Sequence, residues 1–144
     1  MYLDGISNLS SNPSSIGYAV TELMKIAGER SAFIILLDKK MRHIRSVRLK
    51  RRGHMKPESV AVTVDRVINE TGAASFVLAH NHPSGILTPS SADRITTDLL
   101  IRKYNGSNVK FIEHYIVSDD EYITMINIPT NRRYDQLKEG STND

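Results

Sequence analysis

The stretch SFVLAHNHPSGILTPSSAD, residues 75–93, decides the fold of this chain. It begins with an apolar run from Ser75 to Ala79, which is typical of a strand buried on both faces. A segment rich in proline and glycine follows, and helical spacing of apolar residues then extends from about Ser91 to Tyr104. The stretch therefore predicts a buried strand, a loop and a helix, in that order.

Outward from this stretch, the chain continues to alternate helical and extended patterns. These patterns predict helices over 13–27 and about 63–70, and strands over 32–37, 42–50, 109–117 and 122–128. The order α-β-β-α-β-α-β-β indicates an α/β (α+β) fold in which helices pack on one mixed sheet. We expect a single domain over residues 1–128 and a polar tail over 129–144.

Composition excludes several classes of protein. The 144 residues are 40% hydrophobic and 24% charged, which is typical of one globular domain. The absence of cysteine excludes disulfide scaffolds, thiol nucleophiles and cysteine-ligated zinc deaminases. No apolar run approaches the ~20 residues of a membrane span, and no secretory signal is visible, so we expect a cytoplasmic protein without a membrane partner.

Basic residues are concentrated in one part of the chain. Nine of the 19 lysines and arginines lie within residues 39–56, which contain no acidic residue. Such a block favours either nucleic-acid binding or a solvated edge strand whose charges prevent edge-to-edge pairing. On the first interpretation, phosphate contacts come from Arg42, Arg45, Arg48 and Lys50, and affinity falls steeply with salt.

Two histidines and an aspartate form a candidate metal site. In extended backbone His80 and His82 point the same way, and Asp93 follows in the first turn of the next helix. Two imidazoles and a carboxylate suit zinc and leave a fourth position for water, whose pKa zinc lowers to ~7. Alternatively, the histidines are ordinary hydrogen-bonding residues, and Asp93 completes a helix capping box with Ser90.

These residues carry a resemblance to a known family. The spacing His-x-His, seven residues, Ser, two residues, Asp is that of the JAMM motif, and this chain has it at His80, His82, Ser90 and Asp93. The surrounding His-Asn-His-Pro-Ser-Gly and Thr-Pro-Ser, and the later Glu-His-Tyr-Ile at 113–116, resemble the RadC-type JAB/JAMM domain over residues 29–118. His114 is similar to a family position outside the metal ligands.

The resemblance implies a curved mixed β-sheet flanked by helices, as in JAB/MPN-like and cytidine-deaminase-like folds. It implies one zinc ion on His80, His82 and Asp93, and hydrolysis of an amide bond in a peptide or isopeptide substrate. It also implies a glutamate as general base and Ser90 as the residue that helps orient water or stabilises the oxyanion.

Glu29 is our candidate for the base, with Glu22 as the alternative. Counted back from Asp38, Glu29 comes one residue before the family's usual position, which Arg30 occupies. The alternative function is a non-catalytic JAB scaffold that binds nucleic acid or a protein complex, in keeping with the DNA-repair label of RadC relatives.

Overall fold

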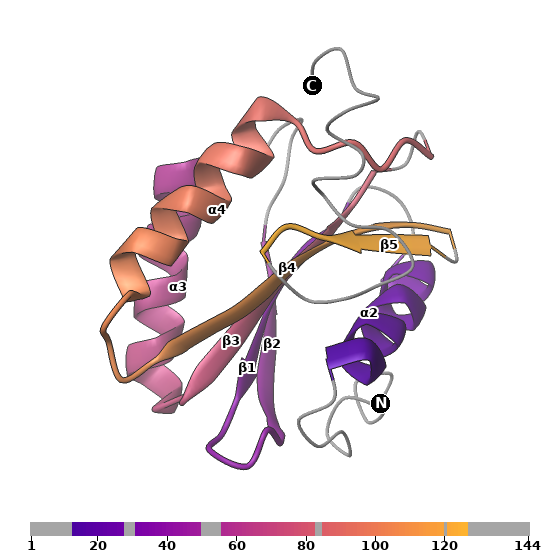
Figure 1. The fold of residues 1–144 in the computed structure, drawn as a ribbon. Coiled ribbons are helices and arrows are strands. Elements are labelled where there is room, and N and C mark those ends of the chain that lie inside the picture. The colour runs from indigo at the N-terminus through magenta and orange to yellow at the C-terminus, as the bar shows by residue number, and fades with distance from the viewer. Residues whose placement is uncertain (1–12, 28–30, 50–55, 83–84, 120, 127–144) are drawn as a thin grey trace.

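The computed structural model describes residues 13–27, 31–49, 56–82, 85–119 and 121–126. These residues form a mixed five-stranded sheet in the order β2-β1-β3-β4-β5 (Figure 1). The strands are β1 (Ala32–Leu37), β2 (His43–Arg48), β3 (Ser75–Asn81), β4 (Lys110–Ser118) and β5 (Glu121–Thr124). Neighbouring strands are antiparallel except for β3 and β4, which are parallel.

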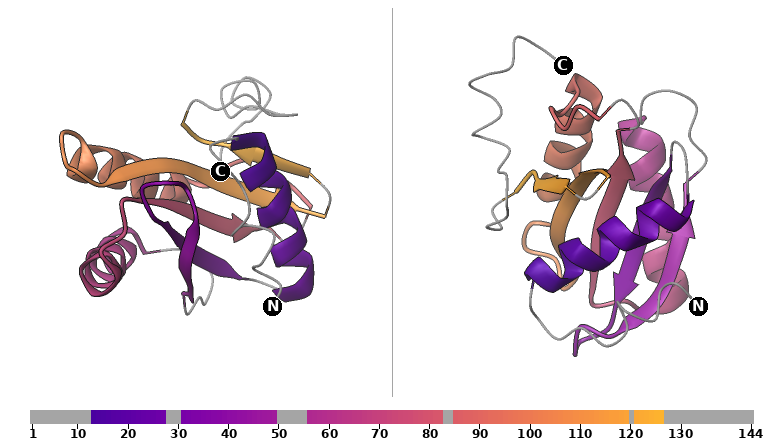
Figure 2. Two further views of the ribbon diagram at one scale, coloured as in Figure 1. Left: turned by 90° about the horizontal axis from the view of Figure 1, so that it is seen from below. Right: turned by 90° about the vertical axis from the view of Figure 1, so that its right-hand side faces the viewer.

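Helices cover both faces of the sheet (Figure 2). Helix α2 (Pro13–Ala27) packs on one face, while α3 (Pro57–Thr71) and α4 (Ser91–Tyr104) pack on the other. Strand β1 alternates between the two apolar cores, with Ile35 facing α2 and Ile34 facing α3, and all six of its residues are buried. The predicted α/β fold with one helix-flanked mixed sheet is confirmed, including the element order.

Helix α3 begins earlier than the predicted start near residue 63. Pro57 occupies its first turn, and Val60 and Ala61 are buried with the apolar residues that follow. Proline is favoured at this position because its missing N–H would have no partner inside the helix. The helix ends where Gly72 adopts a left-handed conformation, with φ of 68°, and donates its N–H to the Ile68 carbonyl.

Helix α4 connects the parallel pair of strands and so determines where the candidate site lies. A parallel connection must return across the sheet, which requires a crossover element such as a helix. The start of α4 therefore lies next to the carboxyl end of β3, the central strand. His80 and Asn81 extend β3 beyond the predicted strand end, because Asn81 still pairs with Val117 of β4.

Strand β4 contains a bulge beside β3. Phe76 pairs with Phe111, but Val77 pairs with Glu113, so Ile112 is an extra residue. An extra residue in one strand shifts every later side chain to the opposite face. His114 consequently pairs with Leu78 and lies on the α4 side of the sheet.

Strand β5 ends at Thr124, short of the predicted end at 128, and residues 127–144 lie outside the described residues. Beyond it, Ile126 donates its backbone N–H to the buried Glu113 carboxylate at 2.8 Å, and the Met125 N–H is shared between that carboxylate, at 3.0 Å, and the His114 carbonyl, at 3.1 Å. The expected tail at 129–144 also lies outside the described residues. Within the described part of the chain, every helix is too short or too polar to cross a membrane.

Candidate metal centre

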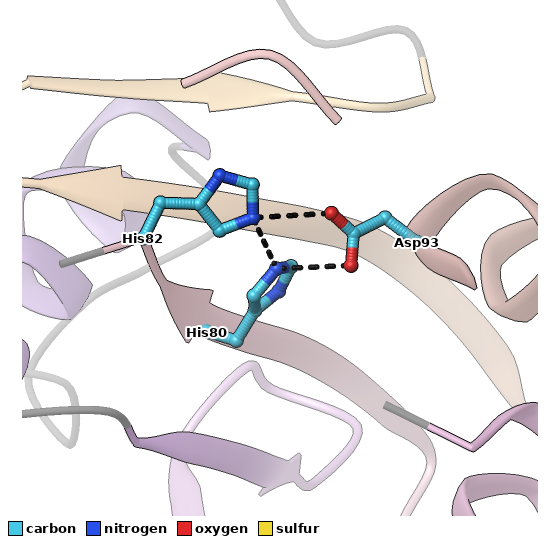
Figure 3. A group of neighbouring side chains, drawn as sticks. All are labelled: His80, His82 and Asp93. Atoms are coloured by element: carbon cyan, nitrogen blue, oxygen red, sulfur yellow. Dashed lines mark hydrogen bonds and ion pairs between the residues drawn. The ribbon is translucent and has the colours of Figure 1, made fainter. Parts of the chain in front are cut away.

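The two histidines of the predicted site point toward each other at the end of β3 (Figure 3). Their Nε2 atoms are 3.0 Å apart. His80 is fully buried and His82 is only 15% exposed, so the pair is largely withdrawn from solvent. The extended backbone at the end of β3 brings them together, since residues i and i+2 of a strand share a face.

Asp93 completes the group from the first turn of α4 (Figure 3). Its Oδ1 lies 3.1 Å from His80 Nε2, and its Oδ2 lies 3.1 Å from His82 Nε2. The predicted capping box is present: Asp93 N donates to Ser90 Oγ, and Ser90 N donates to Asp93 Oδ2. The helix end therefore fixes the carboxylate in front of both imidazoles.

The surroundings of Asp93 also favour the ionised form of its carboxylate. Burial opposes ionisation of Asp93, but the adjoining His80 and His82 side chains outweigh it and hold the pKa of Asp93 well below its usual value. The side chain is thus an anion across the physiological pH range.

His82 is oriented by the main chain. Its Nδ1 lies 2.8 Å from the carbonyl oxygen of Ile86. A carbonyl only accepts hydrogen bonds, so His82 Nδ1 donates, and the neutral ring then carries its lone pair on Nε2. That lone pair faces His80 and Asp93.

The donor set fits a divalent metal ion. The ligand atoms of His80, His82 and Asp93 all lie within 4.8 Å of one another, so the group could hold such an ion. Two atoms that each bind a tetrahedral zinc ion at ~2.0–2.2 Å are ~3.3–3.6 Å apart, close to the separations of 3.0 and 3.1 Å found here. Converging lone pairs and a carboxylate repel one another unless a proton or a metal cation lies among them.

The chain matches a known protein family. A family model described as the RadC-like JAB domain matches residues 10–130, most of the chain. The chain belongs to the RadC-like JAB domain family.

Curated relatives carry the name UPF0758 protein. One from Shewanella piezotolerans is 37% identical over 106 residues, which are 71% of this chain and 47% of the relative. One from Vibrio cholerae is 38% identical over 99 residues, 67% of this chain and 43% of the relative. This RadC-like JAB domain thus spans less than half the length of either relative.

Of the predicted catalytic residues, Ser90 is within the described residues and Glu29 is not. Arg30, which occupies the family's usual position for the base, is also outside them. The alternative base, Glu22, is half-exposed on α2 and pairs with Lys25 at 3.3 Å. Glu22 is not a member of the group formed by the two histidines and Asp93.

Residues 43–48 of the basic segment form the edge strand β2. Its arginines contact residues of the same chain: Arg42 pairs with Asp38 at 2.8 Å, and Arg45 pairs with Glu70 at 3.0 Å. Arg48 donates to Ser31 Oγ and lies over the Phe33 ring. Lys50 lies outside the described residues. Each of these three arginines therefore has a partner within the chain.

Sequence reasoning did not identify three groups that support the site. Asn81, between the two histidines, accepts a hydrogen bond from Ser31 N at its Oδ1 and donates its own N–H to Ser31 O. Thr97 bonds to His114, and the Ile86 carbonyl orients His82. Two of these groups could have been recognised in the sequence: Asn81 is a polar residue inside the His-x-His motif, and Thr97 comes four residues after Asp93. The third is a main-chain carbonyl, which every residue has, so the sequence gives no sign of it.

Proposed function

We propose that this chain is a zinc-dependent hydrolase that cleaves an amide bond of a peptide or isopeptide. The observation that carries the proposal is the convergence of His80, His82 and Asp93, with two nitrogen donors and one carboxylate within 4.8 Å. Three protein ligands with a remaining open position are typical of catalytic zinc sites, whereas structural sites use four.

The bound ion would supply Lewis acidity and lower the pKa of water toward ~7. The chain's own residues provide the other functions. Asp93 places a fixed negative charge beside the two imidazoles, and its capping hydrogen bonds keep it there. Burial of His80 and Asp93 limits competing water and strengthens electrostatic interactions within the site.

Glu29 is the proposed general base. It would accept a proton from the attacking water and deliver it to the leaving amine. Its place in the chain supports this role, because Ser31 is hydrogen-bonded in both directions to Asn81, between the two histidines. Glu29 is only two residues before Ser31 in the sequence.

Ser90 is the proposed oxyanion donor. Its Oγ accepts the hydrogen bond from Asp93 N with a lone pair, so the helix cap does not use the hydroxyl hydrogen. That hydrogen is available to an oxyanion that develops beside the site.

The alternative, a non-catalytic scaffold that binds a protein complex, or nucleic acid through residues 39–56, has less support. Arg42, Arg45 and Arg48 each contact a group of the same chain, so their placement needs no phosphate partner. We therefore retain the hydrolase as the proposed function.

Metal removal tests the proposal. Protein loaded with one zinc ion per chain is assayed on a panel of dipeptides and lysine ε-amide isopeptides, then treated with a chelator and dialysed. We expect hydrolysis to disappear with the zinc and to return when zinc, but not magnesium, is restored, because imidazole ligands suit zinc and magnesium requires oxygen ligands. Hydrolysis that persists at full strength after complete zinc removal would contradict the proposal.

Replacement of Ser90 separates its two roles. Ser90→Ala is expected to keep zinc, reduce turnover ~10²–10³-fold as the oxyanion donor is lost, and destabilise the fold by ~1 kcal/mol as the cap is lost. Ser90→Gly is the matched variant, since glycine lacks the hydroxyl but costs a helix cap only a few tenths of a kcal/mol. Turnover and melting temperature are measured together. Equal turnover in Ser90→Gly and the unaltered chain would exclude Ser90 as the donor.

A further inference from the structure

A row of hydrogen-bonding groups lies behind His80, on the side away from His82 and Asp93. His80 Nδ1 is 2.8 Å from His114 Nε2, and His114 Nδ1 is 2.7 Å from Thr97 Oγ1. Thr97 Oγ1 donates to the main-chain oxygen of Asp93 at 2.8 Å. All three side chains are buried. The row thus starts at one candidate ligand, His80, and ends at another, Asp93.

The positions of the hydrogens follow from the end of this row. Thr97 has one hydroxyl hydrogen, and the Asp93 carbonyl is a stronger acceptor than the Met125 sulfur 3.5 Å away. Thr97 Oγ1 therefore faces His114 as an acceptor, and His114 Nδ1 donates to it. In a neutral His114 the lone pair is then on Nε2, directed at His80 Nδ1.

His80 completes the sequence of donors and acceptors. Because His114 Nε2 accepts, His80 Nδ1 donates, and the neutral His80 ring carries its lone pair on Nε2. That atom is 3.0 Å from His82 Nε2 and 3.1 Å from Asp93 Oδ1. The row therefore favours the His80 tautomer with its hydrogen on Nδ1, which leaves the Nε2 lone pair free to bind a metal ion.

The fold brings these groups close together, although they are far apart in sequence. The bulge at Ile112 turns His114 to the α4 side of the sheet, beside Leu78 and His80. Thr97 is one helical turn after Asp93 on α4, so the same helix carries a candidate ligand and the group that binds His114.

We propose that His114, held by Thr97, is a positioning residue that keeps the proton of His80 on Nδ1 and so directs the Nε2 lone pair to the metal. The inference rests on the proposed zinc site and adds a determinant of its affinity. Hydrogen bonds of this kind to metal-binding histidines commonly contribute 10–100-fold to metal affinity.

The test compares variants of the full chain by zinc affinity, measured in competition with a chromophoric chelator. His114→Phe preserves a flat ring but removes the acceptor, and we expect zinc to bind ~10–100-fold more weakly. His114→Gln provides an amide oxygen that can accept from His80 Nδ1, and we expect it to recover most of the affinity. Thr97→Val is expected to weaken binding, and Thr97→Ser to preserve it.

A spectroscopic measurement distinguishes positioning from a merely structural role. In zinc-loaded protein, His80 Nδ1–H is expected as a proton resonance protected from exchange, present in the unaltered chain and in His114→Gln and lost in His114→Phe. The melting temperature of each zinc-free variant records the effect on folding alone. If His114→Phe fails to fold, the zinc affinities of Thr97→Val and Thr97→Ser test the role of His114 instead.

The outcomes separate this inference from the proposed function. An unaltered chain that binds no zinc would overturn both. An unaltered chain that binds zinc, with equal affinity in His114→Phe and Thr97→Val, would overturn only the role of His114. Equal losses of affinity in His114→Phe and His114→Gln, with no His80 Nδ1–H resonance in the unaltered chain, would also overturn it.

Discussion

Replacing His80 by alanine is expected to reduce bound zinc from one ion per chain to almost none. The substitution removes one of two imidazoles and leaves His82 and Asp93 as the only members of the group. Two ligands hold zinc far more weakly than the three of a catalytic site. The measurement is elemental analysis after dialysis against zinc-free buffer near neutral pH, because protonated ligands release metal in acid.

Two further variants make this result interpretable. His80 is fully buried, so its replacement leaves a cavity that could unfold the chain, and His82→Ala gives the same test at a partly exposed position. His43→Ala is the matched control, since His43 lies on β2 and contacts Ser46. Full zinc occupancy in both His80→Ala and His82→Ala would refute the assignment of the ligands.

The second large effect is expected from Glu29→Gln. Glutamine has nearly the same shape as glutamate but cannot accept a proton at neutral pH, so turnover is expected to fall ~10²–10⁴-fold. Zinc content and melting temperature are expected to stay unchanged. The measurement is the rate of hydrolysis of a peptide or isopeptide by zinc-loaded protein.

Glu22→Gln is the matched control for this substitution. Glu22 is half-exposed on α2 and pairs with Lys25, so its replacement is expected to leave turnover unchanged. Full turnover in Glu29→Gln would exclude Glu29 as the base. A loss confined to Glu22→Gln would instead assign that role to Glu22.

The elements that the sequence predicted well depend on local rules. Helix α4 begins at the predicted residue, since Ser90 and Asp93 form a capping box that can be read from four consecutive positions. His80 and His82 share a face because a strand repeats every two residues. The candidate metal group combines these two local features, so its geometry could be anticipated.

The features that sequence reasoning missed depend on contacts between distant segments. The position of His114 beside His80 results from a bulge at Ile112, and a one-residue change of register reverses every later side chain. The link between Asn81 and Ser31 joins residues 50 positions apart. Neither pairing leaves a periodic signal in the sequence, because each depends on how two strands align in the sheet.

The way in which His82 is held has a consequence for how such a site can diversify. Its Nδ1 donates to the main-chain carbonyl of Ile86, while the Ile86 side chain is 61% exposed. Any amino acid at position 86 carries the same carbonyl, so this side chain can be exchanged while the imidazole keeps its orientation. Mutation or directed evolution can therefore vary the surface beside the site without altering the groups that would bind the metal.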